Sequence, residues 1–98
     1  MLTNANFLGH LVRCIAVGKA LRIARIPVVF AASGRYVDLL HQQNFPVLPI
    51  ITPDRDRTLA AILANQFNFY DLPLARSCGG AEIACIRQLK PAVIVGDF

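Results

Sequence analysis

The chain has 98 residues, of which 55% are hydrophobic and 16% charged, so it can form one small domain but is too apolar to bury every hydrophobic side chain. We therefore expect apolar surfaces that are covered by another domain or by a second copy of the chain. The net charge of +4 is scattered without interleaved aromatic residues, which disfavours nucleic-acid binding and leaves an anionic ligand or a peripheral membrane contact open.

The first third of the sequence predicts a strand, a loop and a helix. Residues 1–3 match the end of a strand, and residues 4–9 match a loop that contains one glycine. Residues 11–25 predict a helix, because apolar residues recur there at helical spacing. Gly18 lies on that apolar stripe and predicts a close approach of the helix to a sheet.

The middle of the sequence predicts two further strands around a second helix. Residues 28–32 are a continuous apolar run, typical of a parallel strand that is buried on both faces. Residues 34–43 predict a helix capped by Ser33, and Asn44 follows where a left-handed residue often ends a helix. Residues 47–51 predict an edge strand, because prolines interrupt the run.

The last third predicts two helices and a fourth strand. Asp54 or Asp56 can cap a helix over residues 58–66. A longer helix begins near Pro73 and reaches residue 89. Residues 92–95 predict another buried strand. The pair Gly79-Gly80 is the weak point of the longer helix, where a late start or a kink is expected.

Three cysteines are present, an odd number without a Cys-x-x-Cys pair. Their spacing predicts buried, reduced thiols in a cytoplasmic protein rather than a disulfide framework. A zinc site needs four ligands at short spacing, and His10 and His41 do not complete one, so no metal site is predicted. The chain holds no membrane-helix run of about 18 apolar residues and no signal-peptide pattern.

The predicted order of strands and helices places one histidine and one aspartate together. The alternation predicts an α/β protein with a Rossmann-like parallel sheet, strand order 3-2-1-4, and flanking helices. Ligands of such sheets bind beyond the carboxyl ends of the strands where the order reverses. His10 follows the first strand and Asp97 follows the fourth, so both are expected in the same crevice.

A histidine and an aspartate in one crevice form a candidate general base. A neutral imidazole can accept a proton near pH 7, and a carboxylate can fix its tautomer and stabilise the imidazolium. The alternative is that His10 is a polar residue at a helix start and Asp97 a turn or cap residue. The glycine fingerprint of dinucleotide-binding proteins and the lysine of phosphate-binding loops are absent, so no cofactor is predicted.

Three segments resemble the N-terminal part of GT-B-fold glycosyltransferases, most closely the UDP-glucosyltransferase-like, macrolide and rhamnosyltransferase type. Residues 9–22, Gly-His-Leu-Val-Arg-Cys onward, resemble their first loop and helix. Residues 28–34 resemble the second strand and turn, and residues 89–98 resemble the segment that ends the fourth strand. One departure is Arg25-Ile26, where these enzymes commonly have a glycine followed by a histidine.

The resemblance implies half of a GT-B fold. Residues 1–98 would be a partial acceptor-side domain, truncated at both ends and inactive alone, with the nucleotide-sugar domain absent and a nucleotide sugar as co-substrate. His10 would be the base on the acceptor hydroxyl and Asp97 its orienting partner. Gly9 and three aromatic residues would bind the small-molecule acceptor, with ordinary core packing as the alternative for the aromatics. Those aromatics are Phe67, Phe69 and Tyr70.

Two other functions stay open. A related group with a similar Gly-His-x-x-Arg-Cys start hydrolyses nucleotide sugars, although the Gly-Asp-Phe ending favours the transferases. A non-catalytic module is the third hypothesis, in which the excess apolar surface binds a partner or a second copy of the chain.

Overall fold

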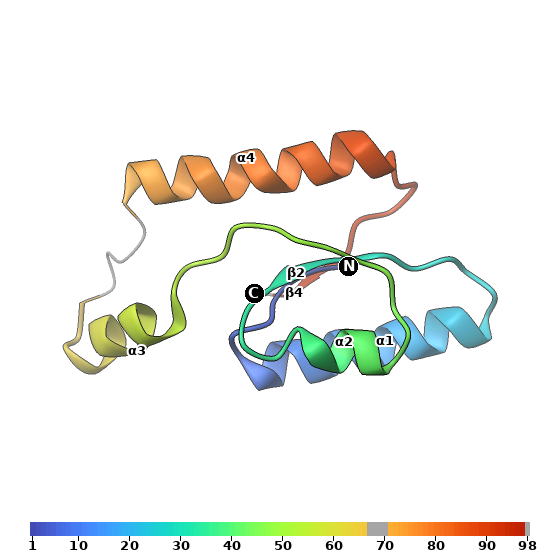
Figure 1. Ribbon diagram of the computed structural model, residues 1–98, viewed down its shortest axis with the longest axis horizontal. Coiled ribbons are helices and arrows are strands. Elements are labelled where there is room, and N and C mark those ends of the chain that lie inside the picture. The colour runs from blue at the N-terminus through green and yellow to red at the C-terminus, as the bar shows by residue number, and fades with distance from the viewer. Residues whose placement is uncertain (67–70, 98) are drawn as a thin grey trace.

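The computed structural model describes residues 1–66 and 71–97 of the chain and shows a four-stranded sheet flanked by helices (Figure 1). Its elements are β1 (Leu2–Asn4), α1 (Leu8–Ile23), β2 (Phe30–Ser33), α2 (Asp38–Gln42), β3 (Val47–Leu48), α3 (Arg55–Leu63), α4 (Leu72–Leu89) and β4 (Gly96–Asp97). All paired strands are parallel and their order is β3-β2-β1-β4. The predicted α/β class and strand order are confirmed.

The helices lie on both faces of the sheet. Figure 1 shows α1 and α2 on one side and α4 on the other. The larger core fills the first side, between these two helices and the central strands; its buried members are Ala5, Leu11, Cys14, Phe30, Ala32, Leu40 and Phe45. A smaller cluster on the side of α4 contains Ala31, Ile50 and Cys85. Most of the hydrophobic burial therefore belongs to the α1 side.

The contact of α1 with the sheet depends on one glycine. A Cβ atom added at Gly18 would lie 3.1 Å from the ring of Phe45 and 3.2 Å from the ring of Phe30. The prediction of a close approach at Gly18 is thus confirmed. Val17 belongs to the apolar stripe predicted for this helix but is 44% exposed, so the buried stripe is narrower than the sequence pattern indicates.

Helix α4 begins with a capped turn. The side chain of Asp71 accepts a hydrogen bond from the backbone N–H of Leu74, and Pro73 occupies the first turn. The helix then runs without a break through Gly79 and Gly80, contrary to the expected late start or kink. Neither glycine has another atom within 4 Å of an added Cβ, so no neighbour forces the helix to bend there.

Two of the predicted strand boundaries are wrong for the same reason. The fourth strand is Gly96–Asp97 and not residues 92–95, and the second begins at Phe30 and not at residue 28. Leu2 pairs with Gly96 on one side and with Ala31 on the other. The earlier residues of both segments lie before the start of β1, where the contacts are single bonds: Val29 accepts from the N-terminus of Met1, and Val95 accepts from the N–H of Leu2. The predicted burial of residues 92–95 is wrong as well: Val93 is 76% exposed.

The second and third helices also differ from the predicted ranges. Ser33 does not cap a helix; it ends β2, and its hydroxyl accepts a hydrogen bond from the N–H of Ile50. The chain turns at Gly34, and α2 therefore starts only at residue 38. Of the two candidate caps for α3, Asp54 accepts the hydrogen bond from Arg57, so that helix begins three residues earlier than predicted.

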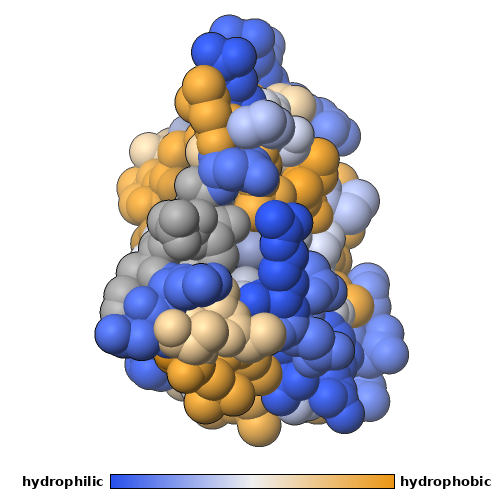
Figure 2. All heavy atoms as spheres, turned by 90° about the vertical axis from the view of Figure 1, so that its left-hand side faces the viewer, coloured by the Kyte–Doolittle hydropathy of each residue, from blue (hydrophilic) through white to orange (hydrophobic). Residues whose placement is uncertain are grey.

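Large hydrophobic side chains reach the surface in several places. Figure 2 shows hydrophobic and hydrophilic groups side by side at the end of the molecule where α3 lies. The most exposed are Ile23 and Leu63, at 84% and 87%, together with Val93. The prediction that one small domain cannot bury all its apolar side chains is confirmed for the described residues.

Candidate functional site

The site begins in the turn between β1 and α1. The side chain of Asn4 accepts a hydrogen bond from the N–H of Asn6 at 3.0 Å, which holds the chain as it leaves the sheet. Helix α1 starts at Leu8, three residues earlier than predicted. Gly9 and His10 therefore lie in the first turn of the helix and not in a loop before it.

The structure brings His10 and Asp97 into direct contact. Asp97 in β4 pairs with Thr3 in β1, so its side chain leaves the sheet next to the start of α1. The Nδ1 atom of His10 lies 2.7 Å from Oδ1 of Asp97. The two residues are 87 positions apart in sequence. The predicted proximity of His10 and Asp97 is confirmed, while a ligand crevice around them and their catalytic role stay predictions.

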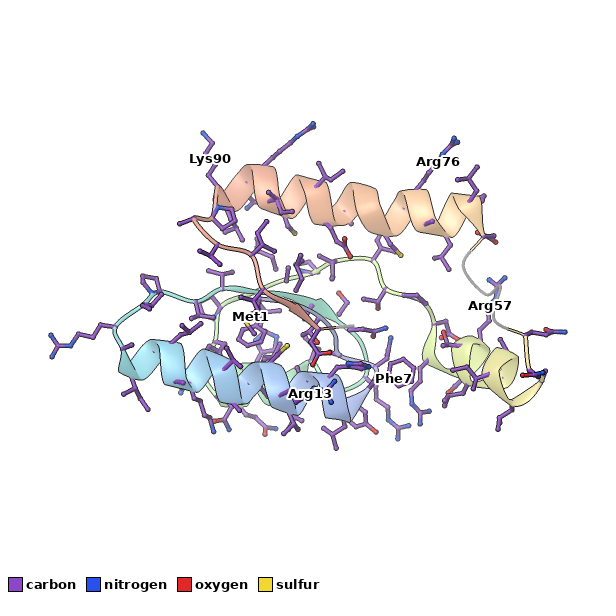
Figure 3. All side chains as sticks on the ribbon, turned by 180° about the vertical axis from the view of Figure 1, so that it is seen from behind. Met1, Phe7, Arg13, Arg57, Arg76 and Lys90 are labelled. Carbon is purple, nitrogen blue, oxygen red and sulfur yellow. The ribbon has the colours of Figure 1, made fainter. Side chains whose placement is uncertain are left out.

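Arg13 completes the cluster and was not predicted as a site residue. Its Nε donates to Oδ2 of Asp97 at 2.6 Å, and its Nη2 donates to Oδ1 at 3.0 Å. Figure 3 shows Arg13 on the N-terminal part of α1. The available signal was the spacing of His10 and Arg13, because residues three apart share one face of a helix.

The short contact with Asp97 defines the tautomer of His10. An ionised carboxylate only accepts hydrogen bonds, so a nitrogen 2.7 Å from it must carry the proton. Nη2 of Arg13 also lies 3.0 Å from Nδ1, but a protonated nitrogen cannot accept a bond from it. In the neutral ring, Nε2 is then the unprotonated nitrogen. It is the atom that can take a proton from a ligand.

The electrostatics of the cluster keep Asp97 ionised. Hydrogen bonds from Arg13, and then from His10, lower the pKa of the Asp97 carboxyl from 3.8 to about 2. The same contact raises the pKa of the Arg13 guanidinium. The side chains of His10 and Asp97 are 30% and 26% exposed, so the pair is partly shielded yet open to a ligand.

One aromatic residue supports the histidine. The ring of Phe7 meets that of His10 edge to face, with centroids 6.2 Å apart and planes at 86°. Figure 3 shows Phe7 at the start of α1, next to the cluster. An edge-to-face contact of this kind restricts the orientation of the imidazole ring.

Gly9, the predicted binding residue that lies within the described part of the chain, has no contact that requires a glycine. A Cβ at Gly9 would find only the end of the Arg13 side chain, 4.0 Å away, so the described residues do not require glycine there. Phe67, Phe69 and Tyr70 lie outside the described residues. Their predicted contact with an acceptor stays a prediction.

The cysteines do not offer a reactive thiol at the site. All three are buried and free, as the sequence indicated. Burial raises the pKa of Cys14, which neighbours Arg13 in sequence, and of Cys78 in α4. Their thiols stay protonated and are poor nucleophiles.

Within residues 1–66 and 71–97, no group of three or more His, Cys, Asp or Glu side chains is placed to hold a metal ion. No helix in the same residues has the length and apolar character to cross a membrane.

An apolar cavity of about 550 Å³ lies at the other end of the strands. Its walls come from the second half of α4, from residues 91–95 and from the chain that leads into β1 and β2. Neither His10 nor Asp97 lines it. The cavity and the polar cluster are thus separate features of the molecule.

Comparison of the chain with known protein families, curated proteins and solved structures finds no match. The function must therefore be argued from the cluster itself and from the residues that carry the resemblance.

Proposed function

We propose that the chain is the acceptor-side part of a glycosyltransferase that moves a sugar from a nucleotide-sugar donor to an acceptor hydroxyl. The observation that carries this proposal is the 2.7 Å contact between His10 Nδ1 and Asp97 Oδ1. It leaves Nε2 of His10 as a base at the carboxyl end of β1, where parallel sheets of this kind bind ligands. The same two positions carry the resemblance to the transferases.

In this mechanism His10 takes the proton of the acceptor hydroxyl through Nε2. The hydroxyl oxygen forms a bond to the anomeric carbon of the sugar while the bond from that carbon to the nucleotide phosphate oxygen breaks. Asp97 stabilises the imidazolium that forms and holds its ring in place. The donor would be held by a nucleotide-sugar domain outside these 98 residues, and no metal or cofactor is proposed.

Hydrolysis of a nucleotide sugar is the second candidate. The same base can activate a water molecule instead of an acceptor hydroxyl. The sequence around the base, Gly9-His10 followed by Arg13-Cys14, also matches the start of the related hydrolases. For either reaction, the hydrogen bond from Arg13 to Asp97 supports a catalytic cluster over the alternative that His10 is a plain polar residue at a helix start.

The non-catalytic module is supported by a different observation. Val93, Ile94 and Val95 are exposed beside β4, at 76%, 47% and 38%. Such a run next to an edge strand is a typical surface for association. In that case the cluster of His10, Arg13 and Asp97 would serve only to attach β4 to α1.

The test is to purify the gene product as its cell makes it, determine its intact mass, and incubate it with a panel of nucleotide sugars. A glycoside formed only when a hydroxyl acceptor is present supports the transferase. Release of free sugar without an acceptor favours the hydrolase. Turnover of no donor, together with self-association of a 98-residue product, favours the non-catalytic module and contradicts the proposal.

A further inference from the structure

Arg13 contacts both members of the candidate base pair. We infer that Arg13 is a positioning residue. Its two hydrogen bonds hold the Asp97 carboxylate so that Oδ1 faces Nδ1 of His10, and Nε2 of His10 stays free as the base. This inference rests on the proposed function for its catalytic meaning, but its geometry can be tested in the chain alone.

The guanidinium of Arg13 and the carboxylate of Asp97 form a bidentate contact between two planar groups. Nε of Arg13 lies 2.6 Å from Oδ2 of Asp97, and Nη2 lies 3.0 Å from Oδ1. Two parallel N–H···O bonds fix the plane of a carboxylate as well as its position. Nη2 also lies only 3.0 Å from Nδ1 of His10, so one guanidinium borders both partners.

The bidentate contact with Arg13 matters for Asp97 because few other contacts orient its carboxylate. It belongs to a two-residue strand that pairs with β1, and the terminal torsion of an aspartate side chain has no sharp preference. Within the described part of the chain, the hydrogen bonds to its carboxylate come from Arg13 and His10. Without Arg13, the carboxylate can turn away from His10 while β4 keeps its place.

The charged and titratable surroundings of His10 come from two elements. Helix α1 supplies Arg13, and β4 supplies Asp97. The ring also meets the uncharged ring of Phe7. A change in the tautomer of His10 after substitution of Arg13 would therefore be transmitted through Asp97.

Substitution by lysine separates positioning from charge. Arg13→Lys keeps the positive charge on α1 but replaces the planar fork with a single ammonium group. Arg13→Gln removes the charge as well. Arg76→Lys is the matched control, because Arg76 lies on α4 and its side chain points away from the rest of the molecule (Figure 3).

The measurement is long-range ¹H–¹⁵N NMR of the ¹⁵N-labelled chain at about pH 8.5, where an ordinary histidine is neutral. We expect the His10 ring of the unmodified chain to be protonated on Nδ1. Arg13→Lys and Arg13→Gln should lose that signature and move towards the pattern of His41, which serves as an exposed reference. Arg76→Lys should leave it unchanged.

An unchanged Nδ1-protonated signature in Arg13→Lys and Arg13→Gln would overturn the inference, because Asp97 alone would then fix the ring. A second measurement needs no variant: the Arg13 Nε–H of the unmodified chain should exchange with solvent more slowly than that of Arg76. Equal exchange rates of the Arg13 and Arg76 Nε–H groups would show that the hydrogen bond from Arg13 to Asp97 is absent. Neither readout involves a nucleotide sugar, so failure of the transferase assay would leave the positioning role standing, and the reverse also holds.

Discussion

At the scale of single residues, Gly34 is the position that tolerates change least. It has a φ of +135°, and a Cβ there would lie 2.5 Å from the backbone N of Asn6 and 2.7 Å from the carbonyl carbon of Ala5. We expect Gly34→Ala to lower the free energy of unfolding by about 3 kcal/mol, because backbone strain and backbone overlap add. Urea unfolding followed by circular dichroism measures it, and a loss below about 1 kcal/mol would contradict this geometry.

Gly18 is limiting for a different reason, since its backbone is helical and the constraint is space. Alanine there gains about 1 kcal/mol of helix propensity but pushes into the rings of Phe30 and Phe45, at a cost of about 1–3 kcal/mol. Both rings are buried, so they have little room to move. We expect Gly18→Ala to destabilise the chain by about 1 kcal/mol in urea unfolding.

The matched control for Gly18 is Gly80 in α4, where an added Cβ meets nothing within 4 Å. Gly80→Ala should stabilise the chain by about 0.5–1 kcal/mol, because only the helix propensity changes. If both alanine variants were stabilising, the close contact between α1 and the rings would be looser than the structure indicates.

The sequence predicted His10 and Asp97 but not Arg13, and the reason is physical. Topology brings the ends of the first and fourth strands together, so residues just after those strands must meet. Which side chain of α1 turns towards them depends on where the helix starts. The predicted helix start at residue 11 left His10 outside the helix, so the direction of Arg13 relative to it was undefined. The observed start at Leu8 puts both residues in the helix, with Arg13 about one turn after His10.

At the scale of elements, several helices end on a left-handed residue. Helix α1 ends at Ile23 and is followed, after its C-cap Ala24, by Arg25 at a φ of 61°. The N–H of Ile26 bonds to the carbonyl of Leu21, and the N–H of Arg25 bonds to the carbonyl of Arg22. This is the Schellman arrangement, which usually carries glycine. Asn44 follows α2 with a φ of 56°, as predicted.

Arg25 therefore adopts the turn that glycine would favour, at the position where the resembling transferases commonly have glycine. A left-handed conformation costs a non-glycine residue roughly 1–2 kcal/mol. We expect Arg25→Gly to stabilise the chain by about 1 kcal/mol in urea unfolding. Asn44→Gly should change stability less, because asparagine tolerates this conformation better. A destabilised Arg25→Gly would mean that the Arg25 side chain contributes contacts of its own.

The attachment of β4 to α1 should depend on pH through Asp97. Its folded pKa of about 2 lies below its ordinary value of 3.8, so the ionised carboxylate stabilises the fold above about pH 4. That contribution is lost as the pH falls through about 2. We expect Asp97→Asn to be less stable than the unmodified chain at neutral pH. The difference should shrink between about pH 4 and pH 2.

Urea unfolding of both proteins at a series of pH values measures this difference. A constant difference between the two proteins down to pH 2 would show that the asparagine acts through packing and not through charge. Removal of the carboxylate also removes the partner of Arg13, so the loss at neutral pH includes an unpaired, exposed cation on α1.

Element positions were more predictable than element ends. The apolar runs around Phe30 and Val47 identified the central strand and its neighbour, because burial demands hydrophobic side chains there. The apolar run at residues 92–95 follows the same rule but lies before the start of β1, where only the carbonyl of Val95 reaches it, by accepting a hydrogen bond from the N–H of Leu2. Strand length is thus set by the partner strand, which a local pattern does not contain.

At the scale of the whole molecule, the two faces of the sheet are unequal. The α1 side holds the larger core, whereas α4 buries only Cys78 and Cys85 and leaves the apolar cavity beside its second half. The composition predicted an excess of exposed apolar surface, and the exposed run at residues 93–95 accounts for part of it. The sequence does not distinguish contact with another domain from contact with a second copy, because both would use the same exposed apolar residues.

The central claim is that the cluster of His10, Arg13 and Asp97 works as a base at the carboxyl end of the sheet. The most direct test compares His10→Ala with His41→Ala in the gene product as its cell makes it. His41 is an exposed histidine on α2, and its loss should leave turnover unchanged. Loss of a general base should lower turnover about a hundredfold or more, and we expect that result for His10→Ala. Equal turnover of the two variants would contradict the catalytic role of His10 and leave the cluster as a clamp between α1 and β4.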